Sequence, residues 1–166
     1  MISRTMQDAL NLQINLEQYS AQLYLAMGAH CDALGFKGFA HWLRIQAGEE
    51  TAHALKLMDF LLDRRGKVEL GKIAAPPQSF GGVIQVFEQT LLHEEGITHK
   101  INSLFALSRT ELDYASEIAL QWYVTEQVEE EANVGQIVDQ LRAIGDQGGG
   151  IWFLDSRMGK RAARTA

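Results

Sequence analysis

The sequence predicts an all-α protein: a bundle of four long helices, with a long crossover between the second and third and a short fifth helix. The only prolines are Pro76 and Pro77, so residues 1–75 and 78–166 lack the residue that most often interrupts a helix. Apolar side chains recur three and four positions apart along four long segments. A length of 166 residues fits one domain with a sizeable core, which we expect to span residues 1–166.

The first two helices are expected at about residues 3–33 and 36–65. Gly35 directly follows the first apolar pattern and is expected to end that helix. Arg64 and Arg65 lie at the expected C-terminal end of the second helix, where their positive charges interact favourably with the helix dipole. Gly66 follows them and is the expected C-terminal glycine.

The connection over residues 67–79 is long for an antiparallel helix hairpin, so we expect a crossover that joins parallel neighbours. The third helix is expected at about 80–108 and the fourth at about 111–144. Thr110 is the expected N-cap of the fourth helix, with Asp113 three residues later as a variant of the capping box.

A glycine-rich hinge at 145–150 leads into the short fifth helix at about 148–160. On an isolated helix, its apolar residues 151–154 would form an exposed patch. The tail beyond residue 158 is locally basic, and we expect its charged side chains to be solvated: Lys160, Arg161 and Arg164.

Composition and charge narrow the function classes. The net charge of −6 disfavours a nucleic-acid surface and is compatible with a metal cation as partner. Cys31 is the single cysteine, so no intrachain disulfide can form, which fits a reducing compartment. No signal-peptide pattern and no run of 18 apolar residues occurs, so we expect a cytoplasmic protein without a membrane span.

Each long helix carries a core stripe that is interrupted at mid-length by a glutamate. The first stripe is Leu10, Gln13, Glu17, Ser20, Tyr24, Met27 and Cys31. The second is Phe39, Leu43, Gln46, Glu50, His53, Leu57 and Phe60. The third is Val83, Phe87, Thr90, Glu94, Ile97, Ile101 and Leu104. The fourth is Leu120, Tyr123, Gln127, Glu130, Val134, Ile137 and Leu141.

Four inward glutamates would need either protons or a cation. A buried, unpaired carboxylate costs several kcal/mol, and no lysine or arginine lies on the stripes. Hard oxygen ligands plus one imidazole suit iron, manganese or zinc better than calcium, and this donor set is large enough for two divalent ions. In the alternative interpretation the glutamates are solvated, and a small change of helical phase would move Glu17 and Glu94 to another face.

The motifs resemble those of the non-haem bacterial ferritins, within the ferritin-like di-iron family, over essentially the whole chain. The resemblance rests on YLAM at 24–27, GEETAHALK at 48–56 and YVTEQVEEEANVGQIVDQL at 123–141. The second helix has Glu-x-x-His at Glu50 and His53, whereas the fourth has Gln127 and Glu130 in place of a second Glu-x-x-His, which is similar to this subfamily. Bacterioferritins carry a haem-ligating methionine where this chain has Thr51, so no haem is expected.

The resemblance implies a set of iron ligands. One iron would bind Glu17, Glu50 and His53, and a second would bind Glu94 and Glu130, with Glu50 bridging. Gln127 would lie beside the pair. A third iron would use Glu49, Glu126 and Glu129, with Glu130 shared.

Two aromatic residues also match family positions. Tyr24 matches a tyrosine that hydrogen-bonds a ligating carboxylate, and Trp122 matches a nearby aromatic residue. One alternative is that Glu49, Glu126, Glu129 and Glu131 form only a solvated acidic face. The alternative for the two aromatic side chains is plain packing.

The function implied is iron storage: oxidation of Fe²⁺ by O₂ or H₂O₂, and mineral deposition inside a shell of roughly 24 copies. The fifth helix would line four-fold contacts in that shell or fold back on its own bundle. One alternative is a peroxide-reducing di-iron enzyme of the rubrerythrin type, disfavoured because no Cys-x-x-Cys pair is present. Another is a metal-free helical scaffold. A mini-ferritin is disfavoured because the ligand set is complete within one chain.

Overall fold

Four long helices lie side by side in the computed structural model, which describes residues 2–145 and 148–163. These are α1 (Arg4–Ala33), α2 (Lys37–Asp63), α3 (Val83–Thr110) and α4 (Tyr114–Ile144), and a short α5 (Gly149–Met158) follows. The all-α class and the four-helix bundle with a short fifth helix are confirmed. Within the described residues, no helix is long and apolar enough to cross a membrane.

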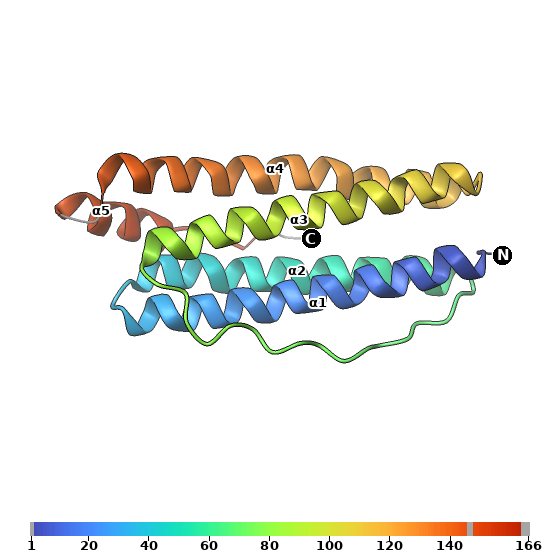
Figure 1. The fold of residues 1–166 in the computed structure, drawn as a ribbon, viewed down its shortest axis with the longest axis horizontal. Helices are drawn as coiled ribbons and strands as arrows, with labels where there is room; N and C mark the ends of the chain where they lie inside the picture. Colours follow the sequence, from blue (N-terminus) through green and yellow to red (C-terminus); the bar gives the residue numbers. More distant parts are fainter. Residues whose placement is uncertain (1, 146–147, 164–166) are drawn as a thin grey trace.

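The connection between α2 and α3 runs the length of the bundle alongside α1 (Figure 1). This crossover returns the chain to the end where α2 began, so α2 and α3 point in the same direction. α1 packs against α2, and α3 packs against α4, so the bundle consists of two antiparallel hairpins. The two hairpins also meet through α1 and α3, which are therefore closer neighbours than α2 and α3.

The helix ends differ from the expected ones at three places: α3 begins at Val83, three residues later than expected, and the ends of α2 and α3 also differ. Gly35 ends α1 as expected, with a left-handed φ of 92°. At the end of α2, however, Arg65 takes the left-handed conformation, with φ of 58°, and Gly66 does not. Gly66 is needed for space, because a Cβ there would lie 2.3 Å from Cδ1 of Leu61.

The predicted cap at Thr110 is wrong. α3 continues through Thr110, whose hydroxyl donates to the carbonyl of Ala106 one turn earlier. The chain turns at Leu112, with φ of 55°, and Asp113 caps α4 by accepting from the amide of Ser116 at 3.2 Å. The short connection therefore lies about three residues later than the sequence predicts.

The core consists of two apolar clusters separated by a polar layer at mid-length. Phe39, Phe87 and Val134 belong to the cluster nearer α5, whereas Leu10 and Leu120 belong to the cluster at the opposite end. The layer between them contains the buried glutamates of the four stripes. The packed clusters hold the helices in register and so fix the height at which the carboxylates meet.

The inner face of α5 folds back on its own bundle. Asp155 accepts from the backbone amide of Phe39 at 2.8 Å, and Leu154 is buried in the core. On the outer face, Trp152 and Phe153 remain 55% and 75% exposed. One face of α5 therefore folds back on its own bundle, as the second alternative for the fifth helix expects. The other face is largely exposed, although the Trp152 ring contacts Phe36.

Glycines lead into α5. Gly145 and Gly148 have positive φ values of 70° and 117°, a conformation that glycine adopts without strain. Residues 146–147 of the predicted hinge lie outside the described residues.

Substitution of Gly38 by alanine should undock α5. A Cβ on Gly38 would lie 1.7 Å from the backbone oxygen of Asp155, so the two helices would have to separate at a cost of about 1–3 kcal/mol. Hydrogen exchange of the α5 amides should become faster. Gly48→Ala in the same helix is the matched control, because no atom of residues 2–145 or 148–163 that could clash lies within 4 Å of its Cβ position. Unchanged exchange in Gly38→Ala would contradict the close contact.

Candidate metal centre

Each of the four long helices places one glutamate in the polar layer. Glu17, Glu50, Glu94 and Glu130 are only 1–2% exposed, and His53 is 7% exposed. The helical phase that placed these residues on the core stripes is therefore correct, and the solvated interpretation of these four glutamates is wrong. Burying a carboxylate costs free energy, whereas exposing it to water does not. Burial of one glutamate on each of the four helices therefore indicates a binding site.

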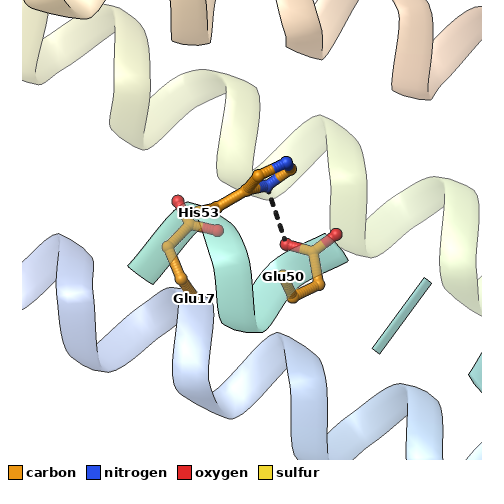
Figure 2. A group of neighbouring side chains, drawn as sticks. All are labelled: Glu17, Glu50 and His53. Atoms are coloured by element: carbon orange, nitrogen blue, oxygen red, sulfur yellow. Dashed lines mark ion pairs between the residues drawn. The ribbon is translucent and has the colours of Figure 1, made fainter. Parts of the chain in front are cut away.

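Three of the side chains form a compact group. Figure 2 shows Glu17 from α1 gathered with Glu50 and His53 from α2. One ligand atom of each lies within 4.8 Å of one from each of the others. Nδ1 of His53 lies 3.5 Å from Oε2 of Glu50. Two carboxylates and an imidazole at this separation suit one transition-metal ion.

A second group includes His53, Glu126 and Glu130, with ligand atoms within the same 4.8 Å. Glu126 comes from the fourth helix and is half-buried. The sequence placed Glu126 with Glu49 and Glu129 in an outer site, but in the structure Glu126 also reaches the inner one. Among the described residues, neither Glu49 nor Glu129 belongs to a triad of ligand atoms this close.

Glu94 lies in the layer with its own hydrogen-bond donors. It accepts from the hydroxyl of Tyr24 and, at 3.2 Å, from the amide nitrogen of Gln127. Tyr24 thus makes the kind of contact with a carboxylate that the resemblance implied. Trp122 lies edge-on to His53, with ring centroids 5.2 Å apart, and Nζ of Lys56 lies 3.4 Å from the centre of the Trp122 ring.

Two glutamines support the carboxylates in ways that the sequence reasoning missed. Gln13 donates to Glu17 at 2.7 Å. Gln46 donates to both Glu50 and Glu130, each at 2.9 Å, and so joins the two hairpins. Both glutamines lie four residues before a stripe glutamate, a spacing that places side chains on one helix face and that could have revealed them.

Burial raises the pKa of every stripe glutamate. It raises the pKa of Glu17 to about 8, with Glu50 adding repulsion. It raises that of Glu130 to about 7, with further repulsion from Glu94 and Glu49. The pKa values of Glu50 and Glu94 are also raised, chiefly by burial. Without a cation the layer therefore retains protons near neutral pH, and a divalent ion would displace them.

Glu49 lies beside the layer and has a partner that the sequence did not predict. Its Oε2 accepts from Nη2 of Arg161 at 2.5 Å, while its Oε1 is buried with no hydrogen-bond partner among the residues that the structure describes. The side chain of Arg161 is only 18% exposed, so the expectation of a solvated tail is wrong at this position. Lys160 is exposed as expected, and Arg164 lies outside the described residues.

Comparison with known proteins agrees with this geometry. Residues 7–144 match the model of the ferritin-like domain family. The chain belongs to the ferritin-like family. Its relatives include bacterial non-heme ferritins from Bacteroides fragilis and Campylobacter jejuni. The first is 39% identical over 97% of this chain and 100% of the relative, and the second is 41% identical over 93% of each.

Solved ferritins share the fold along its whole length. An open pore ferritin from the hyperthermophilic archaeon Archaeoglobus fulgidus is 43% identical, with a TM-score of 0.97, over 98% of this chain and all of that one. A humanized archaeal ferritin is 42% identical, with a TM-score of 0.98, over 99% of this chain and all of that one. The family and the bundle predicted from the sequence are therefore confirmed.

The metal-free protein should lose stability as the pH rises from about 5 to 8. The folded state retains protons that the unfolded chain releases above pH 4.5, so folding takes up protons in this window and stability falls through it. Glu17 alone should contribute on the order of a few kcal/mol to this fall. Thermal unfolding with a chelator at several pH values measures it.

Glu17→Gln is the direct test of that assignment, because its neutral amide needs no proton when buried. We expect this variant to lose less stability than the parent protein between pH 5 and 8. Glu95→Gln, at an exposed position on α3, is the control and should follow the parent. Identical pH profiles for Glu17→Gln and the parent would refute the raised pKa of Glu17.

Proposed function

We propose that the chain stores iron by oxidising Fe²⁺ at a di-iron ferroxidase centre within each subunit. The observation that carries this proposal is the layer of four buried glutamates and one histidine, contributed by all four helices. Membership of the ferritin-like family supports iron storage as the function. The donor set suits iron, because hard carboxylate oxygens combined with an imidazole favour a transition metal over calcium.

In this proposal one Fe²⁺ binds Glu17, Glu50 and His53. The second binds Glu94 and Glu130, and Glu50 bridges the two ions. Iron here is the substrate. Each ion gives up one electron, and O₂ takes both electrons with two protons to become H₂O₂. Carboxylates favour the ferric product, which lowers the free energy of the oxidised state relative to the ferrous one.

The neighbouring side chains have supporting roles in the proposal. Gln127, which donates to Glu94, lies beside the ion pair and positions the oxidant. Tyr24, hydrogen-bonded to the same carboxylate, holds Glu94 in place. Gln46 holds Glu50 and Glu130 at a fixed separation before metal binds.

We infer that oxidised iron leaves the centre for a mineral inside a hollow shell of roughly 24 copies. An outer iron site at Glu49, Glu126 and Glu129, with Glu130 shared, would lie on its exit path. The buried, unpaired Oε1 of Glu49 is consistent with such a site. Trp152 and Phe153, exposed on the outer face of α5, would be covered by contacts between copies.

The double substitution Glu50→Ala with His53→Ala should abolish fast Fe²⁺ oxidation and leave assembly intact. It removes the bridging carboxylate and the only imidazole of the inner group, so neither ion retains its ligand set. Anaerobic Fe²⁺ titration followed by exposure to oxygen measures binding and rate, and size-exclusion mass measurement reports assembly.

Glu95→Ala with His99→Ala is the matched control, since it removes the same two residue types from exposed positions on α3. That variant should oxidise Fe²⁺ at the parent rate. Fast oxidation in the Glu50→Ala and His53→Ala variant would refute the site. A parent protein that binds two Fe²⁺ but elutes as a small oligomer would refute the shell.

A further inference from the structure

After α5, the described residues 159–163 turn back along the bundle beside α2 (Figure 1). There the backbone carbonyl of Arg161 accepts from Nε2 of His41 at 2.9 Å. The Arg161 guanidinium lies 4.3 Å from the centre of the Trp42 ring. The tail is thus held by α2 through both its backbone and its side chain.

The guanidinium makes two specific hydrogen bonds beside the carboxylate layer. Nη2 donates to Glu49 at 2.5 Å, and Nη1 donates to Oε1 of Gln46 at 2.9 Å. An arginine can only donate, so it fixes which end of the Gln46 amide faces the tail. The opposite end, the NH₂ group, then donates to Glu50 and Glu130.

The positively charged guanidinium of Arg161 lies in direct contact with the Glu49 carboxylate. The Glu49 side chain is only 11% exposed, so water screens this pair weakly. A divalent ion bound to the same carboxylate would lie a few ångströms from the guanidinium, where like charges repel. Arg161 occupies Oε2 of Glu49 and leaves Oε1 for a metal ion, so the competition is electrostatic: the guanidinium charge weakens the attraction of the same carboxylate for a cation.

We propose that Arg161 is a tethered cation that competes with a metal ion for Glu49, so that the outer site binds metal weakly until the tail moves away. This inference rests on the outer site of the proposed function. By linkage, metal bound at Glu49 weakens the attachment of the tail to the same degree. A groove of about 320 Å³ lies beside Arg161, lined on α4 by Asn133, Gln136 and Ile137, and gives the side chain room to move.

Movement of Arg161 would also affect the inner pair of ions. Once the guanidinium leaves, Oε1 of Gln46 loses a charged donor and its amide is free to reorient. The bonds to Glu50 and Glu130 then weaken together. Filling of the outer site is thus linked to loosening of two carboxylates that hold the inner ions, which favours release of the oxidised product.

The test is calorimetric titration of the assembled, metal-free protein with Zn²⁺, which is redox-inert and reports binding alone. The parent protein should bind two ions tightly and a third weakly. Arg161→Gln should bind the third about tenfold more tightly or better, within the usual range of coupling between linked sites. Arg161→Gln combined with Glu49→Gln should lose that gain.

Arg157→Gln is the matched control, because Arg157 lines the same groove but pairs with Gln140. It should bind zinc like the parent. A chain ending at Lys160 removes the same charge by another route and should also show the tighter third site. An unchanged third affinity in both Arg161 variants would overturn the proposal, as would an equal gain in Arg157→Gln.

The same titration separates this proposal from the proposed function. If the parent fails to bind two ions tightly, the inner centre is wrong, whatever happens at Glu49. If two ions bind tightly and loss of Arg161 leaves the affinity for the third ion unchanged, the inner centre is supported and the proposed role of Arg161 is refuted.

Discussion

The structure depends on one constraint: four carboxylates must be buried at the same height of a helical bundle. An unpaired charge there would cost several kcal/mol, a large share of the stability of a domain this size. Three kinds of partner reduce that cost. Protons remain on the carboxyls because their pKa values are raised, the Gln13 and Gln46 amides donate hydrogen bonds, and a metal would replace the protons.

The two apolar clusters on either side make the layer possible. They supply the packing that holds the helices while the middle of the bundle is polar. The resulting bundle has packed apolar clusters on both sides of a polar layer whose side chains can take up or release ions.

The helices and the inner layer were predictable because they depend on local spacing. Glu17, Glu50, Glu94 and Glu130 lie on their stripes by the three- and four-residue period, and no distant contact is needed to place them. The cap of α4 was misplaced, because Thr110 and Asp113 are both good caps and only the turn at Leu112 decides between them.

The contacts of Arg161 depend on the tertiary fold and could not be predicted in the same way. Arg161 and Glu49 are 112 residues apart, and α5 must dock on α2 before they meet. A basic tail pattern alone cannot distinguish a solvated arginine from a buried one. The sequence also placed Glu126 in one outer site with Glu49 and Glu129. In the structure, a ligand atom of Glu126 lies close to His53 and Glu130 instead, because Glu126 and Glu130 are one helical turn apart on α4.

The crossover has a consequence for how the site is held together. Glu17, Glu50 and His53 belong to the α1–α2 hairpin, and Glu94, Gln127 and Glu130 belong to the α3–α4 hairpin. The chain passes from one hairpin to the other only through residues 64–82, which lie along the outside of α1 (Figure 1). The site is thus made of two halves, one on each hairpin, that are joined covalently only by this crossover. A pair of ions bridged by Glu50 would act as a non-covalent cross-link between the halves.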